Sequence, residues 1–163
     1  MKTMLIVITF FCLMLVSVNA QDVVITGNIT TNTELTANNT YLLKGLVRVQ
    51  SGATLTIQEG TKIYGANDGS PDPASALIIK PGGKLIANGT ELNPIIFTSE
   101  FNRPGSSRLP TYGDWGGVII LGNAPINVPG GTAIIEGPGD SFGGTNPDDD
   151  SGILRYVRIE YTG

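Results

Sequence analysis

The apolar residues of this chain come in short runs separated by turn-forming residues. The apolar spacing of an amphipathic helix is absent after the first twenty residues. The runs are rich in Val, Ile, Leu and Thr, and the residues between them are mostly Gly, Pro, Asn and Ser. The runs lie at residues 23–25, 46–49, 55–57, 77–79, 95–97, 118–121, 134–135 and 153–159. This alternation of short strands and tight turns predicts an all-β chain.

Two segments repeat one pattern about thirty residues apart. Residues 52–57 read Gly-Ala-Thr-Leu-Thr-Ile and precede a Gly-Thr turn, and residues 83–87 read Gly-Lys-Leu-Ile-Ala and precede another. The extra length lies at residues 65–75, where Asn, Asp, Gly and Pro cannot continue a strand. A supersecondary unit that recurs every 20 to 30 residues or so is typical of a solenoid.

Stacked coils would make such short strands stable. Each coil buries few side chains, but stacking at about 4.8 Å pairs every strand with the coils above and below it. In this arrangement like residues form internal columns, and we expect Leu55 over Leu85 and Ile57 over Ala87. The sequence therefore predicts a right-handed parallel β-helix.

A β-sandwich is the alternative architecture. Its strands would alternate between apolar and polar positions and would be joined by hairpins. Residues 77–79 and 118–121 are instead apolar at successive positions. This pattern favours the solenoid.

Residues 1–20 have the organisation of a secretory signal. Lys2 supplies a positive start, residues 4–16 form an apolar run, and Val18-Asn19-Ala20 fits a signal-peptidase site. The alternative is a membrane anchor, but the run is shorter than the roughly 20 apolar residues that span a bilayer. We predict cleavage after Ala20, no membrane span in the mature chain, and a β-helix domain over residues 21–163.

Composition narrows the chemistry of the exported domain. The chain has no histidine, and its one cysteine, Cys12, lies in the predicted signal, so the mature chain has neither a disulfide nor a thiol nucleophile. Ten basic and fourteen acidic residues give a net charge of −4. That balance provides no basic surface for nucleic acid.

Four segments together resemble secreted bacterial right-handed β-helix proteins of the pectin-lyase-like superfamily. These segments are residues 52–57, 89–99, 115–122 and 154–161. The resemblance implies the fold and a secreted or cell-surface location, but it implies little about activity. Such relatives are typically longer, so we expect this chain to be an N-terminal fragment, and we expect its open last coil to self-associate.

Residues 139–143, Gly-Asp-Ser-Phe-Gly, match the pattern of a serine nucleophile elbow. A serine nucleophile of that type needs a histidine base. Because the chain has no histidine, we interpret this segment as a Gly-rich loop.

The most acidic stretch is a candidate calcium loop. Asn146, Asp148 and Asp150 place oxygen ligands at alternate positions, as in the first half of such a loop. Ser151 stands where the loop glycine belongs, and Val157 where the bidentate Glu belongs. The alternative is a solvated turn, so calcium is a possible cofactor and no other is indicated.

Trp115, Tyr112 and Asp114 are the candidate ligand-binding residues. Aromatic faces beside a carboxylate suit stacking on sugar rings. The alternative is that Trp115 packs against the core.

We therefore hypothesise an adhesive or glycan-contacting scaffold without enzymatic activity, with an extracellular polysaccharide or surface glycan as its partner. The second hypothesis is a polysaccharide lyase or glycoside hydrolase, which would need two facing carboxylates or a base with a charge neutraliser. Carboxylates for such a site are Asp114, Glu136, Asp140 and Asp148. Nothing in the sequence brings two of them together.

Overall fold

The structure, a computed structural model, describes residues 21–67, 69 and 75–163. The predicted signal, residues 1–20, lies outside the described residues. Within the described ranges there is no helix long and apolar enough to cross a membrane.

Short strands make up almost all of the regular structure. The one helical element among the described residues is a 3-10 turn, η1 (Glu100–Asn102). The strands are β1 (Gln21–Ile29), β2 (Thr33–Leu35), β3 (Asn39–Val49), β4 (Thr54–Ile57), β5 (Lys62–Gly65), β6 (Ala76–Ile79), β7 (Lys84–Asn88), β8 (Ile95–Ser99), β9 (Val118–Ile120), β10 (Ala133–Ile134), β11 (Ser141–Phe142), β12 (Gly152–Arg155) and β13 (Val157–Ile159).

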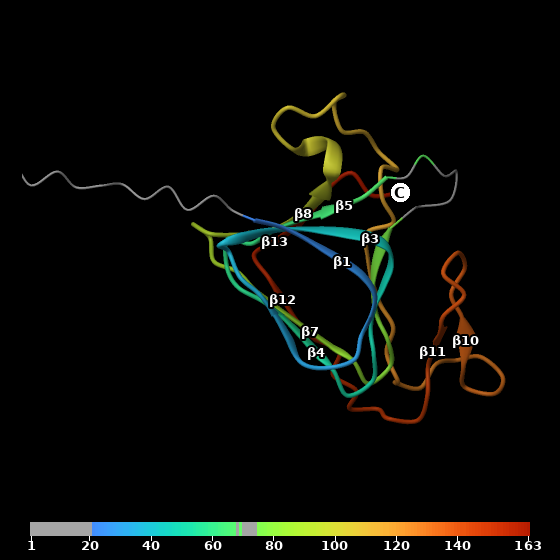
Figure 1. Ribbon diagram of the computed structural model, residues 1–163. Coiled ribbons are helices and arrows are strands. Elements are labelled where there is room, and N and C mark those ends of the chain that lie inside the picture. The colour runs from blue at the N-terminus through green and yellow to red at the C-terminus, as the bar shows by residue number, and fades with distance from the viewer. Residues whose placement is uncertain (1–20, 68, 70–74) are drawn as a thin grey trace, which may run out of the picture.

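The strands wind into coils whose walls are three parallel sheet faces (Figure 1). The long strand β3 serves two faces because it bends at Gly45, whose φ of 70° is a left-handed conformation that glycine adopts without strain. Its first half pairs with β5 and its second half with β6. The first face contains β1, β3, β5, β8 and β13, the second β3, β6 and β9, and the third β2, β4, β7 and β12.

The internal columns have the expected register. Leu55 pairs with Leu85 and Ile57 with Ala87, in parallel, and Leu35 continues the second column into the preceding coil. All five side chains are buried. The prediction of an all-β parallel β-helix is confirmed, and the β-sandwich alternative is wrong.

The strands β6 and β9 are apolar at consecutive positions because apolar residues pack on both sides of them. Leu77 and Ile79 point into the coil interior, whereas Ile78 belongs to a second apolar cluster on the outer side of the second face. Residues 122–150 leave the coil after β9 and fold back over this outer side, where Ile135 and Phe142 pack. Figure 1 shows this excursion beside the coil, with β10 and β11 in it. These two strands pair antiparallel, outside the coil itself.

Candidate functional site

A loop over residues 100–114 connects β8 to β9 and lies against the outer side of the first face (Figure 1). It begins with η1, whose N-cap Ser99 accepts a hydrogen bond from the amide of Phe101. The Arg103 guanidinium lies 4.2 Å above the ring of Tyr64 and forms a 2.8 Å ion pair with Asp22 of β1. The loop is therefore attached to strands of three different coils.

Asp114 is the internal anchor of this loop. Its side chain is 2% exposed. Arg108 Nη2 donates to its Oδ1 at 2.6 Å, Ser99 Oγ donates to its Oδ2 at 2.6 Å, and the Thr111 amide donates to Oδ2 at 2.9 Å. Burial alone would raise the pKa of Asp114, but these hydrogen bonds outweigh it and lower the pKa to about 2. Asp114 is thus ionised near neutral pH, and its hydrogen bonds hold the loop in shape.

Trp115 lies in the core and not on the surface. It is 0% exposed, its ring stacks on Phe97 with centroids 6.4 Å apart, and its Nε1 donates to the Glu160 carbonyl at 2.8 Å. The indole lies over Gly65, where a Cβ would approach it to 2.4 Å. The expected exposed stacking face is therefore absent, because the indole packs inside the coil against Gly65.

Tyr112 has the exposure that a stacking residue needs. It is 86% exposed and stands between Thr111 and Gly113, both of which are fixed by hydrogen bonds. Leu109 on the same loop is 83% exposed. Of the three candidate ligand-binding residues, the structure leaves Tyr112 alone with an accessible side chain.

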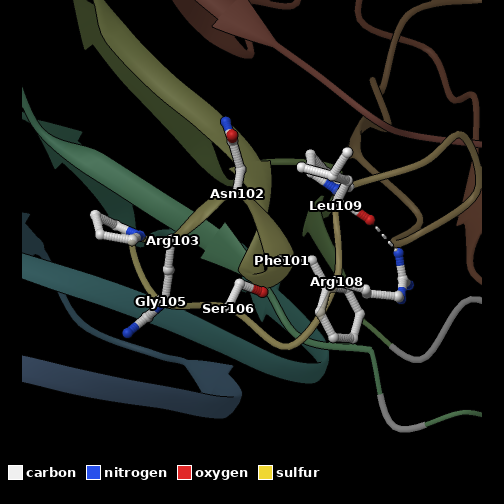
Figure 2. Close-up of a pocket in the computed structure, with 9 residues that line it drawn as sticks. Phe101, Asn102, Arg103, Gly105, Ser106, Arg108 and Leu109 are labelled. Carbon is white, nitrogen blue, oxygen red and sulfur yellow. Dashed lines mark hydrogen bonds between the residues drawn. The ribbon is translucent and has the colours of Figure 1, made fainter.

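The same loop curls around a cavity of about 510 Å³ (Figure 2). Among the described residues that line it, two are basic and none is acidic. Arg108 lies 3.5 Å above the ring of Phe101 and also donates to the Leu109 carbonyl, the bond dashed in Figure 2. The lining residues are Phe101, Asn102, Arg103, Pro104, Gly105, Ser106, Arg108, Leu109 and Pro110.

Sequence reasoning missed the two arginines of this cavity. Both precede a proline, Arg103 directly at Pro104 and Arg108 two residues before Pro110. An arginine in a Pro- and Gly-rich loop is a signal that could have indicated a surface site, because functional residues concentrate on such loops.

A second charged group lies on the outer side of the second face. Asp140, 8% exposed, forms ion pairs with Arg48 Nε at 3.0 Å and Lys80 Nζ at 2.6 Å. Burial opposes ionisation of Asp140, but the hydrogen bonds from Lys80 and Arg48 outweigh it and lower its pKa. The neighbouring Ser141 begins β11, in a short antiparallel pair and not at the start of a helix.

The three candidate calcium ligands lie in one exposed turn, but their oxygens are partly engaged. Asn146 Oδ1 accepts from the Asp148 amide at 3.2 Å. Asp150 accepts from Lys84 Nζ at 2.8 Å and from the Gly152 amide at 2.9 Å, and these hydrogen bonds lower its pKa. In the part of the chain that the structure describes, there is no group of three or more His, Cys, Asp or Glu that could hold a metal ion. Calcium binding stays a prediction.

A family described as a pectate-lyase-like beta helix domain matches residues 27–163. No curated protein and no solved structure matches.

Proposed function

Because this chain belongs to the pectate-lyase-like β-helix family, we propose that it is an exported scaffold that contacts extracellular or cell-surface glycans without cleaving them. Membership of the family establishes the fold. A fold of this kind supports many activities, so the function has to be argued from the site.

Tyr112 is the observation that carries the proposal. Its ring is 86% exposed, whereas the loop beneath it is fixed by the buried Asp114. A rigid aromatic residue loses little conformational entropy on binding and offers an apolar face with a polar hydroxyl, which matches a pyranose ring. The cavity lined by Arg103 and Arg108 lies on the same loop and adds hydrogen-bond donors for sugar hydroxyls or acidic groups.

The state of the buried carboxylates argues against glycoside hydrolysis. A glycoside hydrolase needs one carboxylic acid that is protonated near neutral pH and a second carboxylate facing it. Asp114 and Asp140 are each held ionised by cationic partners, and their pKa values are lowered. Neither can serve as the proton donor. Glu136 and Asp148 are exposed.

The test is a glycan array probed with the full 163-residue chain and with two variants. Tyr112→Ala should abolish binding to the glycans that the unmodified chain retains. Leu92→Ala is the matched control, since Leu92 is 89% exposed on a different turn, and it should bind normally. Equal binding by Tyr112→Ala would contradict the assignment of the site, and binding to no glycan would contradict the proposal itself.

A depolymerisation assay on the retained glycans separates the scaffold from an enzyme. We expect no unsaturated ends and no new reducing ends, with or without calcium. Release of either kind of end would establish the lyase or the hydrolase alternative and overturn the proposal.

Export and calcium binding are the two remaining parts of the proposal. Expression with the signal intact should give an extracellular product whose N-terminus is Gln21, as read by mass spectrometry. Calcium at Asn146, Asp148 and Asp150 should raise the melting temperature, because a ligand that binds the native state stabilises it. Asp148→Asn should remove this shift.

A further inference from the structure

A second cavity, of about 460 Å³, lies between the outer side of the second face and the excursion over residues 122–150. Leu46, Ala76 and Ile119 line it from β3, β6 and β9. These strands are adjacent, since Leu46 pairs with Ala76 and β6 pairs with β9. One wall is therefore a continuous aliphatic surface on a rigid sheet.

The excursion supplies the opposite wall through Glu136, Gly137 and Pro138. These residues sit in a closed turn, because the Ile135 amide donates to the Asp140 carbonyl at 2.9 Å and the Gly139 amide donates to the Ile135 carbonyl at 3.2 Å. The turn is short and its ends are hydrogen-bonded, so the wall keeps its shape without a ligand.

Asp140 fastens this turn to the sheet. Its carboxylate lies between Arg48 of β3 and Lys80, which directly follows β6. Arg48 Nη2 also reaches the Pro138 carbonyl at 3.5 Å. The width of the cavity is thus set by ion pairs between its two walls, and the site is preorganised.

The lining chemistry defines one class of ligand. Glu136 carries the one charged side chain among the described residues that line the cavity, and it is exposed; Gly116 and Gly163 complete the lining. Arg48 and Lys80 direct their charged groups to Asp140 and do not line the cavity. We propose that this cavity binds a compact apolar or aromatic molecule that carries one ammonium group, with the apolar body on Ile119 and its neighbours and the ammonium on Glu136.

The size of the cavity agrees with such a ligand. Small-molecule sites typically measure about 300 to 1,000 Å³ and combine apolar lining with a few polar groups that orient the ligand. Tyr112 does not line this cavity, although Gly163, which does, lies beside the Tyr112 ring. The two assignments rest on different side chains, Glu136 here and Tyr112 for the glycan contact, so each can fail without the other.

The experiment is an NMR titration of the full chain with benzylammonium, benzyl alcohol and benzoate, three probes with one ring and a different charge. Benzylammonium should bind about tenfold more tightly than benzoate, the factor that one charge-assisted hydrogen bond supplies, with benzyl alcohol between them. Chemical-shift changes should be centred on Ala76, Ile119 and Gly137.

Two variants locate the contact. Glu136→Gln should remove the preference for the ammonium probe while leaving the benzyl alcohol affinity within about twofold, since the apolar wall is unchanged. Glu91→Gln, an exposed residue outside the cavity, should behave as the unmodified chain. Because both substitutions are at the surface, folding is retained.

The proposal is overturned by any of three results. These are benzoate binding as tightly as benzylammonium, an ammonium preference that survives Glu136→Gln, and no saturable binding of the three probes. Because Tyr112 does not line the cavity, Tyr112→Ala should leave the preference for the ammonium probe unchanged, and failure here is distinguishable from failure of the glycan proposal.

Discussion

Gly65→Ala adds a single methyl group at the place where the core is tightest. A Cβ at this position would lie 2.4 Å from Trp115 Cδ2, against roughly 3.5 Å or more for an ordinary carbon contact. The indole would have to move by about 1 Å, away from Phe97 and from the Glu160 carbonyl to which it donates. Overpacking of this kind costs about 1 to 3 kcal/mol, and the weakened hydrogen bond about 1 kcal/mol.

One effect opposes this loss. Alanine restricts the unfolded chain more than glycine does and favours folding by about 0.4 to 1 kcal/mol where the backbone allows it. The net expectation is a loss of about 2 kcal/mol in the free energy of unfolding. Urea denaturation followed by far-ultraviolet circular dichroism measures it.

A double-mutant cycle identifies the cause. Trp115→Leu removes the ring that the new methyl group would strike, so adding Gly65→Ala to Trp115→Leu should cost little. An unchanged or raised urea midpoint for Gly65→Ala would refute the reasoning. Strict additivity of the two substitutions would refute it as well.

Three further predictions follow from the charged groups and the last strands. The pKa of Asp114 is about 2 in the folded chain, against 3.8 for an unperturbed aspartate, so its ionisation contributes about 2 kcal/mol to the free energy of unfolding above about pH 4. This contribution is lost as the pH falls through 2. Asp114→Asn should remove it in urea denaturation at pH 7, and no difference there would contradict this prediction. Asp140→Asn should increase amide hydrogen exchange across residues 122–150 while the coil stays protected, and unchanged exchange would exclude its fastening role. Leu154 and Ile159 belong to core-facing columns, yet their side chains are 45% and 44% exposed. We therefore expect two copies of the 163-residue chain to associate through β12 and β13 in analytical ultracentrifugation, and we expect Leu154→Lys to prevent the association. A monomer at high concentration would exclude this contact.

The repeat pattern was sufficient to predict the architecture and part of the register. Leu55 and Leu85 occupy equivalent places in two Gly-initiated strands, and a column forms wherever equivalent residues stack. The consecutive apolar residues of β6 also argued against a sandwich. The sequence did not show why Ile78 is apolar, because the excursion that buries it could not be placed on the outer side of β6 from the sequence.

The candidate site was less predictable because its contacts follow no regular local spacing. Asp114 binds Arg108 of its own loop and Ser99 directly before that loop, whereas Arg103 contacts Tyr64 and Asp22 in other coils. No local spacing connects residues that belong to different coils.

Trp115 illustrates the same limit. Tyr112 and Trp115 both lie beside glycines, and the sequence does not show which of the two rings is exposed and which is buried. The choice depends on the space above Gly65, which exists only once the coils are stacked.

Methyl and backbone nuclear Overhauser effects measured on the folded chain test the coil stacking most directly. The account predicts methyl cross-peaks that join Leu55 to Leu85 and Ile57 to Ala87, with the backbone pattern of parallel pairing between β4 and β7. Strong Hα–Hα cross-peaks between β4 and β7, which antiparallel strands produce, would contradict it. Absence of the Leu55–Leu85 cross-peak would contradict it equally.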